Sequence, residues 1–296
     1  MTIIGTPQAE HAIDAALVAG LLADQHADLA HLPLREVDSG WDNALFRLGD
    51  ELAVRLPRRA AAASLIVHEQ EWLPQLAGDL PLPVPVPVRR GEPGRGYPWR
   101  WSVVRWLHGA PADRAAPDTS QAEPFAAFLR ALHRPAPPSA PANPVRGVPL
   151  AQRAAVAEAR MRRLERAAEL VPPTIPALWQ AALAAPLDHP PVWLHGDLHP
   201  QNVLVAAGAI SGVIDWGDIT AGDPATDLAA IWMLFAEPAA RAAALAAYGP
   251  ISPATLARAR AWAVLFSLLL LDNGLVDAPR HALVAERTLR RLADLP

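Results

Sequence analysis

Residues 194–205 read LHGDLHPQNVLV and residues 213–217 read VIDWG, and these two stretches hold the densest group of polar side chains in the chain. Short apolar runs flank the polar residues and favour strands, and Ala207-Gly208 between them is typical of a hairpin turn. We therefore expect Asp197, Asn202 and Asp215 to lie in one site, although they are separated along the chain. Capping of turns by the same Asp and Asn residues is the structural alternative.

This pattern resembles the aminoglycoside phosphotransferase family, which are small-molecule kinases related to protein kinases. The family pattern is His-Gly-Asp, then an Asn five residues after the Asp, then a hydrophobic strand that ends in Asp. Residues 195–197, Asn202 and Asp215 meet all three parts. Residues 222–229, GDPATDLA, and the segment from Leu129 to His133 also resemble the family. A match in three parts with their spacing is far more specific than a single triplet.

The resemblance covers about residues 37–235 and implies an α+β, protein-kinase-like fold with two lobes. A small mixed N-terminal lobe, residues 1–108, would bind the nucleotide, and a larger, mainly helical lobe, residues 109–296, would hold the catalytic loop and the acceptor. The patterning of the chain agrees, because a strand-rich first third is followed by a helical remainder. We expect helices over about residues 9–22, 60–76 and 151–170, and strands over 44–48, 51–56, 101–107 and 192–194.

The resemblance implies transfer of the γ-phosphoryl group of ATP, or GTP, to a hydroxyl of a small molecule. Phosphoryl transfer depends on alignment and charge neutralisation, and a carboxylate beside the acceptor hydroxyl orients it and accepts its proton. Asp197 takes this catalytic position. Asn202 and Asp215 would ligate Mg²⁺, which prefers hard oxygen ligands. His195 and Asp227 would support the catalytic loop.

The nucleotide-binding part departs from the family pattern at one position. In such kinases a strand lysine contacts the α- and β-phosphates and pairs with a helix glutamate. The chain contains no Lys; Arg55, in the run 52–56 (LAVRL), takes that position, and Glu69 is the matching acid. Arginine keeps the charge but is bulkier and planar, so the exchange is not neutral. It leaves open weaker nucleotide binding, a shifted phosphate, or an inactive relative, with a surface ion pair as the structural alternative.

Two further segments are expected at the nucleotide. The loop from Ser39 to Asn43 lies where a phosphate-covering turn belongs, and its backbone N–H groups and the Ser39 hydroxyl would face phosphate oxygens. It holds a single Gly, so an ordinary hairpin loop fits nearly as well. Arg105, Trp106 and Leu107 end a strand and would form the hinge whose main chain meets the adenine.

The acceptor implied by the resemblance is an antibiotic such as an aminoglycoside, which would make the chain an antibiotic-resistance enzyme; a macrolide or a metabolite hydroxyl is also open. Acidic side chains at the mouth of the site would suit a cationic aminoglycoside. The candidates are Asp218, Asp223 and Asp272. A solvated surface explains these acids about as well.

Two other functions stay open. A nucleotide-binding pseudokinase without turnover is motivated by the missing lysine. A metal-dependent hydrolase is motivated by His195 and His199, which flank Asp197 and would offer imidazole and carboxylate ligands to a transition metal. That segment supplies at most three ligands, and no other compact pair of histidines stands out.

The composition excludes several classes of protein. Apolar residues make up 52% of the 296 residues, so disorder of the whole chain is excluded, and the net charge of −4 argues against a general nucleic-acid binder. Absence of Cys excludes disulfides and thiolate zinc sites. We expect no membrane span, because the most apolar stretch, residues 261–271, has about half of the ~20 residues that a bilayer requires. The expectation is a cytoplasmic monomer or homodimer that binds a hydroxylated small molecule.

Overall fold

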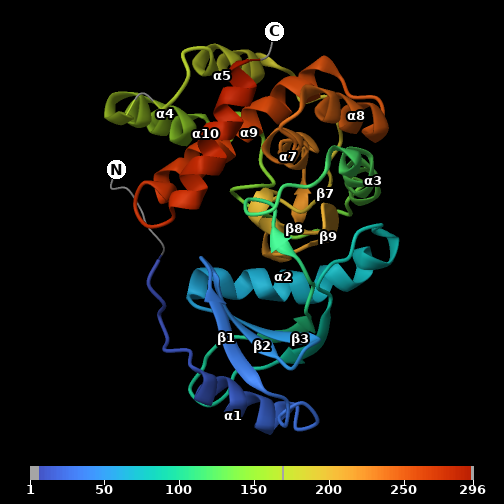
Figure 1. Ribbon diagram of the computed structural model, residues 1–296, viewed down its shortest axis with the longest axis vertical. Helices are drawn as coiled ribbons and strands as arrows, with labels where there is room; N and C mark the ends of the chain where they lie inside the picture. Colours follow the sequence, from blue (N-terminus) through green and yellow to red (C-terminus); the bar gives the residue numbers. More distant parts are fainter. Residues whose placement is uncertain (1–6, 169, 295–296) are drawn as a thin grey trace.

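The structure is a computed structural model, and it describes residues 7–168 and 170–294 (Figure 1). Five antiparallel strands in the first third form one sheet, in the order β1-β2-β3-β5-β4. The strands are β1 (Leu34–Ser39), β2 (Asn43–Leu48), β3 (Leu52–Pro57), β4 (Pro87–Gly91) and β5 (Trp101–Arg105). Along β2, half-buried and fully buried side chains alternate, as expected for a strand with one face on the core.

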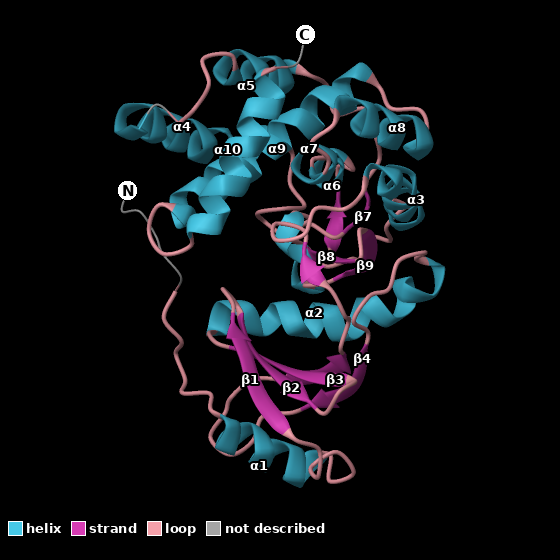
Figure 2. Cartoon of the chain, in the orientation of Figure 1, coloured by secondary structure: helices cyan, strands magenta, loops and turns pink. Residues whose placement is uncertain are grey.

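Two helices cover the two faces of this sheet (Figure 2). The first, α1 (Ala15–Gln25), packs Val18, Leu21 and Leu22 into an apolar cluster that includes Phe46 and Trp101 of the sheet. The second, α2 (Ala60–Leu76), lies across the opposite face, between the sheet and the helical part of the molecule. Helix α2 carries Glu69 and lies where the sheet meets the rest of the protein.

Helix α2 continues through Pro74, although proline has no N–H to donate to the carbonyl four residues earlier. That carbonyl belongs to Gln70, which is buried. The guanidinium of Arg90, on β4, donates to it instead. The Gln70 side chain donates from Nε2 to the carbonyl of Trp101 at 2.8 Å and to Ser102 Oγ at 3.0 Å. Side chains from the sheet thus support the helix where its own hydrogen-bond ladder is interrupted.

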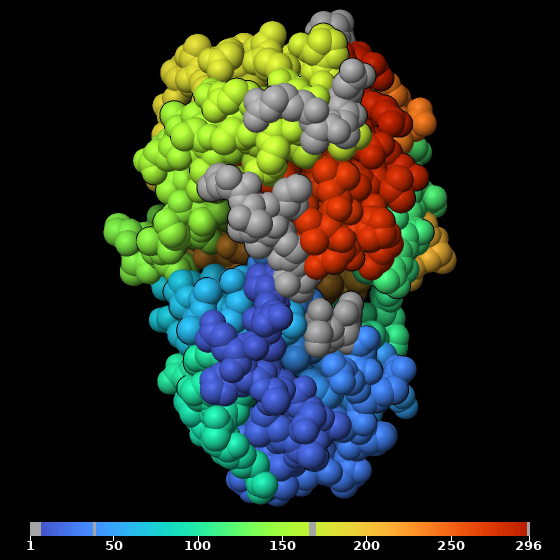
Figure 3. All heavy atoms as spheres, turned by 90° about the vertical axis from the view of Figure 1, so that its left-hand side faces the viewer, coloured from blue at the N-terminus to red at the C-terminus, as the bar shows by residue number. Residues whose placement is uncertain are grey.

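The remainder of the chain is mainly helical, with two small sheets at its centre. Strand β7 (Val192–Leu194) pairs with β10 (Thr220–Gly222), and β8 (Val203–Ala206) pairs with β9 (Ala209–Val213) and β6 (Ala110–Pro111). The helices around them are α3 (Ala122–Leu132), α4 (Ala154–Ala168), α5 (Ile175–Ala184), α6 (Ala225–Leu228), α7 (Ala230–Leu234), α8 (Pro238–Tyr248), α9 (Pro253–Gly274) and α10 (Pro279–Ala293). In the space-filling view the sheet region, blue to teal, and the helical region, green to red, form the lower and upper parts of the molecule (Figure 3).

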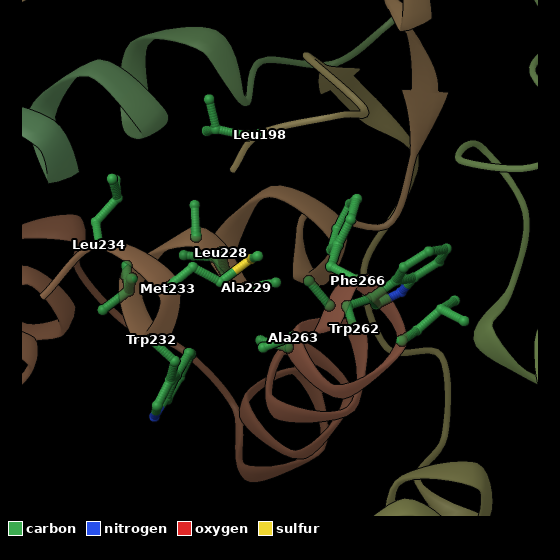
Figure 4. Close-up of a cluster of buried hydrophobic side chains, with 14 of the residues drawn as sticks. Leu198, Leu228, Ala229, Trp232, Met233, Leu234, Trp262, Ala263 and Phe266 are labelled. Carbon is green, nitrogen blue, oxygen red and sulfur yellow. The ribbon is translucent and has the colours of Figure 1, made fainter. Parts of the chain in front are cut away.

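Aromatic side chains fill the core of the helical part. Helix α9 contributes Trp262 and Phe266, which lie in one cluster with Leu228, Trp232 and the loop residue Leu198 (Figure 4). Helix α9 is long and apolar enough to cross a membrane, with a mean hydropathy of 1.5 over its most apolar 18 residues. However, 72% of these residues are buried inside the molecule. It is a largely buried helix of this core.

Most expected elements are present, and some of their ends differ. The bounds of α2 and β7 agree with the prediction. Helix α1 begins at Ala15 and not near residue 9, because Asp14 caps it by accepting from the N–H of Leu17 at 2.8 Å. Strand β5 ends at Arg105, so Trp106 and Leu107 lie in the connection to β6. The order of a sheet followed by a helical part confirms the α+β expectation.

Candidate active site

The loop after β7 is held by one buried carboxylate. Asp227, on α6, accepts hydrogen bonds from the backbone N–H of His195 at 2.7 Å and of Gly196 at 2.9 Å. Gly196 has φ +85°, and a Cβ there would lie 2.5 Å from the carbonyl oxygen of Asp218, so the position requires glycine. This tight turn presents Asp197 directly after it.

His195 connects the loop to the segment that carries Asp215. Its Nδ1 accepts from the N–H of Asp197 at 3.2 Å, so Nε2 carries the proton and donates to the carbonyl of Ile214 at 2.9 Å. Both ring nitrogens are therefore occupied by main-chain partners. Among the described residues no three His, Asp or Glu side chains are grouped so as to hold a metal ion. The hydrolase hypothesis thus has no ligand set in the described part of the chain.

The hairpin of β8 and β9 brings Asn202 and Asp215 together. Val203 pairs with Val213, and the N–H of Ile214 donates to the carbonyl of Asn202 at 2.9 Å. Asp215 adopts a left-handed backbone conformation, with φ +63°, and its side chain is 46% exposed. The amide Nδ2 of Asn202 donates to the carbonyl of Asp197 at 2.8 Å, which leaves the amide oxygen available for a ligand. The structure therefore places the three predicted residues in one cluster.

Asp197 is paired with an arginine from a loop remote in sequence. Arg146 Nη2 lies 2.6 Å from Asp197 Oδ1, and His199 Nε2 lies 3.4 Å from Oδ2. Burial alone would raise the pKa of Asp197, but the charge of Arg146, together with the interaction with His199, outweighs burial and holds this pKa well below its usual range. Asp197 is consequently ionised at neutral pH, as a group that orients and deprotonates a hydroxyl must be.

Arg55 bridges two acids from different parts of the fold. Its Nη1 lies 2.5 Å from Glu69 Oε2 on α2, and its Nη2 lies 2.7 Å from Asp215 Oδ1. The side chains of Arg55 and Glu69 are 10% and 1% exposed, so the alternative of a surface ion pair is wrong. Burial opposes the charge of Arg55, but Glu69 and Asp215 outweigh burial and raise its pKa further. Arg55 thus stays charged and links β3 of the sheet to Asp215, the candidate metal ligand.

The turn between β1 and β2 lies near the acidic residues Asp197 and Asp215. The N–H of Gly40 donates to the carbonyl of Asn43 at 2.9 Å, and Asp42 pairs with Arg59 at 2.6 Å. Burial raises the pKa of Asp42, and the charges of Asp215 and Asp197 act in the same direction, which places this turn within their electrostatic reach. The side chain of Ser39, predicted to face phosphate, lies outside what the structure describes.

The expected hinge connects the two parts of the fold. The N–H of Trp106 donates to the carbonyl of Glu51 at 2.8 Å, and its ring is covered by the Arg47 guanidinium at 4.2 Å. Arg105 is exposed at the end of β5. Within the described residues, the N–H groups of Leu107 and His108 have no backbone hydrogen-bond partner.

The three acids expected at the acceptor mouth are all engaged by other side chains. Asp223 forms an ion pair with Arg258 at 2.5 Å in which both side chains are buried, 2% and 3% exposed. Asp272, on α9, accepts from Arg160 Nε at 2.7 Å and also from Arg163. The remaining acid, Asp218, accepts from Asn143 Nδ2 at 2.7 Å. Burial first, and the charge of Asp197 second, raise the pKa of Asp218 to about 6.

Two residues of the cluster gave no signal in the sequence. Arg146 and Asn143 belong to the Pro-rich connection between α3 and α4, where no periodic pattern exists to assign a side chain to a face. The Asn143 side-chain oxygen accepts from the N–H of Val145 at 2.9 Å and of Arg146 at 3.0 Å, and this turn directs the chain toward Asp197. An Asn three residues before an Arg is compatible with such a turn. The sequence does not show, however, that Arg146 pairs with Asp197.

The comparison with known families agrees with this geometry. The sequence model described as the phosphotransferase enzyme family matches residues 33–262. The chain belongs to this family. It is therefore a small-molecule phosphotransferase, and the kinase-like fold expected from residues 195–215 is confirmed by solved structures of similar shape.

Individual relatives of this phosphotransferase cover most of the chain. The viomycin phosphotransferase of Streptomyces vinaceus is 30% identical over 213 residues, which are 64% of this chain and 70% of that protein. The structure of aminoglycoside 2′-phosphotransferase-IIIa with GDP has a TM-score of 0.71 at 17% identity, covering 95% of this chain and 99% of that one. The macrolide 2′-phosphotransferase of Brachybacterium faecium has a TM-score of 0.59 at 23% identity, covering 96% and 98%. At these identities the two structures show the fold alone.

Proposed function

We propose that this phosphotransferase transfers the γ-phosphoryl group of ATP or GTP to a hydroxyl of a small molecule, with Asp197 as the catalytic base. The observation that carries the proposal is the convergence of Asp197, Asn202 and Asp215, joined by hydrogen bonds within one loop and hairpin. If these residues only capped turns, nothing would require Asp197 to be ionised or Asp215 to be half-exposed. His195 and Asp227 act as positioning residues, because they bond the main chain of this loop.

The cluster has the donor chemistry that Mg²⁺ requires. Asp215 offers a half-exposed carboxylate and Asn202 a free amide oxygen, which are hard ligands, and phosphate and water would complete the shell. When bound there, Mg²⁺ neutralises charge on the β- and γ-phosphates. Asp197 orients the acceptor hydroxyl and takes its proton. Arg55 is held by Glu69 and Asp215, and its charge beside the candidate metal ligand would help to neutralise the α- and β-phosphates.

The donor is proposed from the hinge and from the relatives. Relatives of the same fold are described in complexes with GDP and with ATP. In this chain the N–H groups of Leu107 and His108 are free, among the described residues, to meet either base. Because both nucleoside triphosphates are supplied in the cytoplasm, we place the reaction there. The acceptor class proposed from the relatives is a hydroxylated antibiotic, such as viomycin, a macrolide or an aminoglycoside.

The proposal is tested by ADP and GDP release across a panel of hydroxylated antibiotics and metabolites, with Asp197→Asn as the paired control. We expect Asp197→Asn to lower acceptor-dependent turnover by at least about 10²-fold, the scale of a positioned base, while nucleotide binding persists. Retained turnover would exclude Asp197 as the base. Stabilisation by nucleotide without release for any acceptor would instead support the pseudokinase.

A further inference from the structure

The side chain of Arg146 is held in place by packing before it reaches Asp197. Its Cβ lies against the turn of the loop after β7, since a Cβ on Gly196 would be 3.3 Å from it. Its guanidinium lies over the ring of Phe266, with Cζ 4.6 Å from the ring centroid, and Phe266 belongs to the buried core of the helical part (Figure 4). An arginine that stacks on an aromatic face is restricted in its orientation. The guanidinium therefore approaches Asp197 from a fixed direction.

The turn that carries Arg146 is anchored to β10, the strand that pairs with β7. Gly147 leaves no room for a side chain, because a Cβ there would lie 2.6 Å from Oγ1 of Thr220, on β10. The N–H of Gly147 donates to the carbonyl of Asn143 at 3.0 Å and closes the turn. Asn143 Nδ2 donates to Asp218 Oδ1 at 2.7 Å. The position of Arg146 is thus set by the part of the fold that also positions the loop after β7.

The two carboxylate oxygens of Asp197 have different surroundings. Oδ1 lies 2.6 Å from Arg146 Nη2, which is the distance of a short charge-assisted hydrogen bond. Oδ2 lies 3.4 Å from His199 Nε2 and 3.4 Å from Asn202 Nδ2, and both distances exceed the usual range of roughly 2.7–3.2 Å. Asn202 Nδ2 makes its shorter bond, 2.8 Å, to the backbone carbonyl of Asp197. Oδ2 is therefore the oxygen whose bonds are weak enough to be exchanged for a bond to a ligand.

The charges around Asp197 show why its carboxylate needs this arginine. Arg55 pairs with Asp215 at 2.7 Å, so Asp215 has its own cation. A third acid, Asp218, lies near enough for the charge of Asp197 to act on it. Removal of Arg146 would leave Asp197 facing Asp218 without its shortest side-chain bond among the described residues. The carboxylate would then be free to turn.

We infer that Arg146 is a positioning residue, which holds Asp197 through Oδ1 and thereby assigns Oδ2 as the atom that receives the proton of the acceptor hydroxyl. The hydroxyl oxygen forms a bond to the γ-phosphorus, and its proton passes to Oδ2. The bond between the γ-phosphorus and the β–γ bridging oxygen breaks, and its electron pair leaves with the nucleoside diphosphate. The inference rests on the proposed function, because it takes Asp197 as the base.

The first test compares kcat and KM for nucleoside diphosphate release, with viomycin as the acceptor and, in its absence, with water. We expect Arg146→Gln to lower kcat by about 10²-fold, because a positioned base contributes about 10²–10⁴-fold. The KM values for nucleotide and acceptor should change by less than about threefold, since Arg146 acts in the transfer step. Arg146→Lys keeps the charge and should recover about tenfold of the lost kcat.

The matched control is Arg260→Gln, because the guanidinium of Arg260 also lies over an aromatic ring of the helical part, that of Trp232, at 5.9 Å. This variant should keep the kcat of the wild type. An unchanged kcat in Arg146→Gln, a change confined to KM, or an equal loss in Arg260→Gln would overturn the inference.

The second test is a double-mutant cycle with Asp197→Asn. Because Arg146 acts through Asp197, Asp197→Asn/Arg146→Gln should have the kcat of Asp197→Asn alone, whereas independent effects would multiply and overturn the inference. Arg146→Lys passes through the same cycle, so the result does not depend on the folding of Arg146→Gln. Calorimetry with Mg²⁺ and a non-hydrolysable ATP analogue should give wild-type affinity for every variant. Turnover that persists in Asp197→Asn would overturn the proposed function itself.

Discussion

Arg55 takes the position at which the resemblance to kinases predicts a lysine, and the structure shows which groups its guanidinium contacts. The planar guanidinium binds Glu69 with one nitrogen and Asp215 with the other. A lysine ammonium is a single point charge and does not reproduce this fork. The exchange therefore couples the helix glutamate directly to the metal-ligand candidate.

Removal of this charge should destabilise the fold. Arg55→Met would leave Glu69 buried without a cation, and we expect the free energy of unfolding to fall by about 3–5 kcal/mol. Arg55→Met/Glu69→Gln should recover most of that loss, and Arg55→Lys should lose less than Arg55→Met. Urea unfolding of the four proteins measures this, and equal losses in the single and double variants would contradict the role of Glu69.

Asp218 should make stability depend on pH. Its pKa is about 6 in the folded protein and that of an unfolded aspartate is about 3.9, so the folded state binds more protons between these values. The free energy of unfolding therefore decreases as pH rises from about 4 to about 6. Asp218→Asn should be more stable than the wild type above pH 6, by up to about 3 kcal/mol, and the difference should vanish below pH 4.

Urea unfolding between pH 4 and pH 8 measures this difference, with the exposed Asp50→Asn as the control. The low pKa of Asp197 acts in the opposite direction, but only as pH falls below about 4, and it is present in both proteins. A constant difference between Asp218→Asn and the wild type across the range would show that Asp218 does not titrate there.

Among the elements, α2 has a turn that depends on a hydrogen-bond donor from the sheet. Pro74 leaves the Gln70 carbonyl without a helical donor, and Arg90 replaces that donor. The repaired turn lies directly after Glu69, so the position of the acid that pairs with Arg55 depends on it.

A double-mutant cycle tests this repair of α2. Arg90→Met should lower the free energy of unfolding by about 1–3 kcal/mol in the Pro74 protein, because a buried carbonyl loses its donor. In the Pro74→Ala background the alanine N–H is available to the same carbonyl, and the loss should be smaller. Equal losses in the two backgrounds, measured by chemical unfolding, would show that Arg90 acts independently of the proline.

At the scale of the whole molecule, the sheet region and the helical region are joined close to the proposed catalytic cluster of Asp197, Asn202 and Asp215. Arg55 pairs with Asp215 across the two regions, and the N–H of Val213 donates to the carbonyl of Pro83 at 2.9 Å. A nucleotide that contacts Arg55, the hinge and Asp215 would add further contacts between the same regions. Binding should therefore stabilise the molecule as a whole.

Part of this stabilisation by the nucleotide should require Asp215, the candidate ligand of Mg²⁺. Saturating ATP with Mg²⁺, at about a hundred times its Kd, should add about 2.7 kcal/mol to the free energy of unfolding. Asp215→Asn removes a carboxylate ligand, so the Mg²⁺-dependent part should disappear while the metal-independent part persists. Thermal unfolding with ATP, with and without Mg²⁺, separates the two, and an unchanged Mg²⁺ effect would refute the assignment of Asp215.

Prediction from the sequence succeeds where the determining interactions are local. The spacing of Asp197, Asn202 and Asp215 depends on a loop and a hairpin between neighbouring strands, so the amino-acid pattern alone is enough to recognise the cluster. The bounds of α2 follow from its periodic apolar residues, and Pro74 does not end the helix because a distant arginine compensates. The predicted start of α1 is an exception: Asp14 is a local cap that the sequence contains, and the prediction extended the apolar pattern past it.

Charge pairing in the acceptor region is not predictable in the same way. The sequence suggests Asp223 and Asp272 as free acids, and the structure pairs them with arginines on segments remote in the chain. Arg146 reaches Asp197 from a Pro-rich connection without periodicity.

The motif in residues 195–215, through its resemblance to the family, thus suffices to predict the kinase-like fold, the membership of the phosphotransferase family and the clustering of Asp197, Asn202 and Asp215, because these residues are close in the chain. The electrostatic character of the acceptor side follows from tertiary packing alone. Coulomb energy depends on the distance between charges in space, and the arginines of α4 approach Asp272 and Arg146 approaches Asp197 only when α4, α9 and the Pro-rich connection pack together.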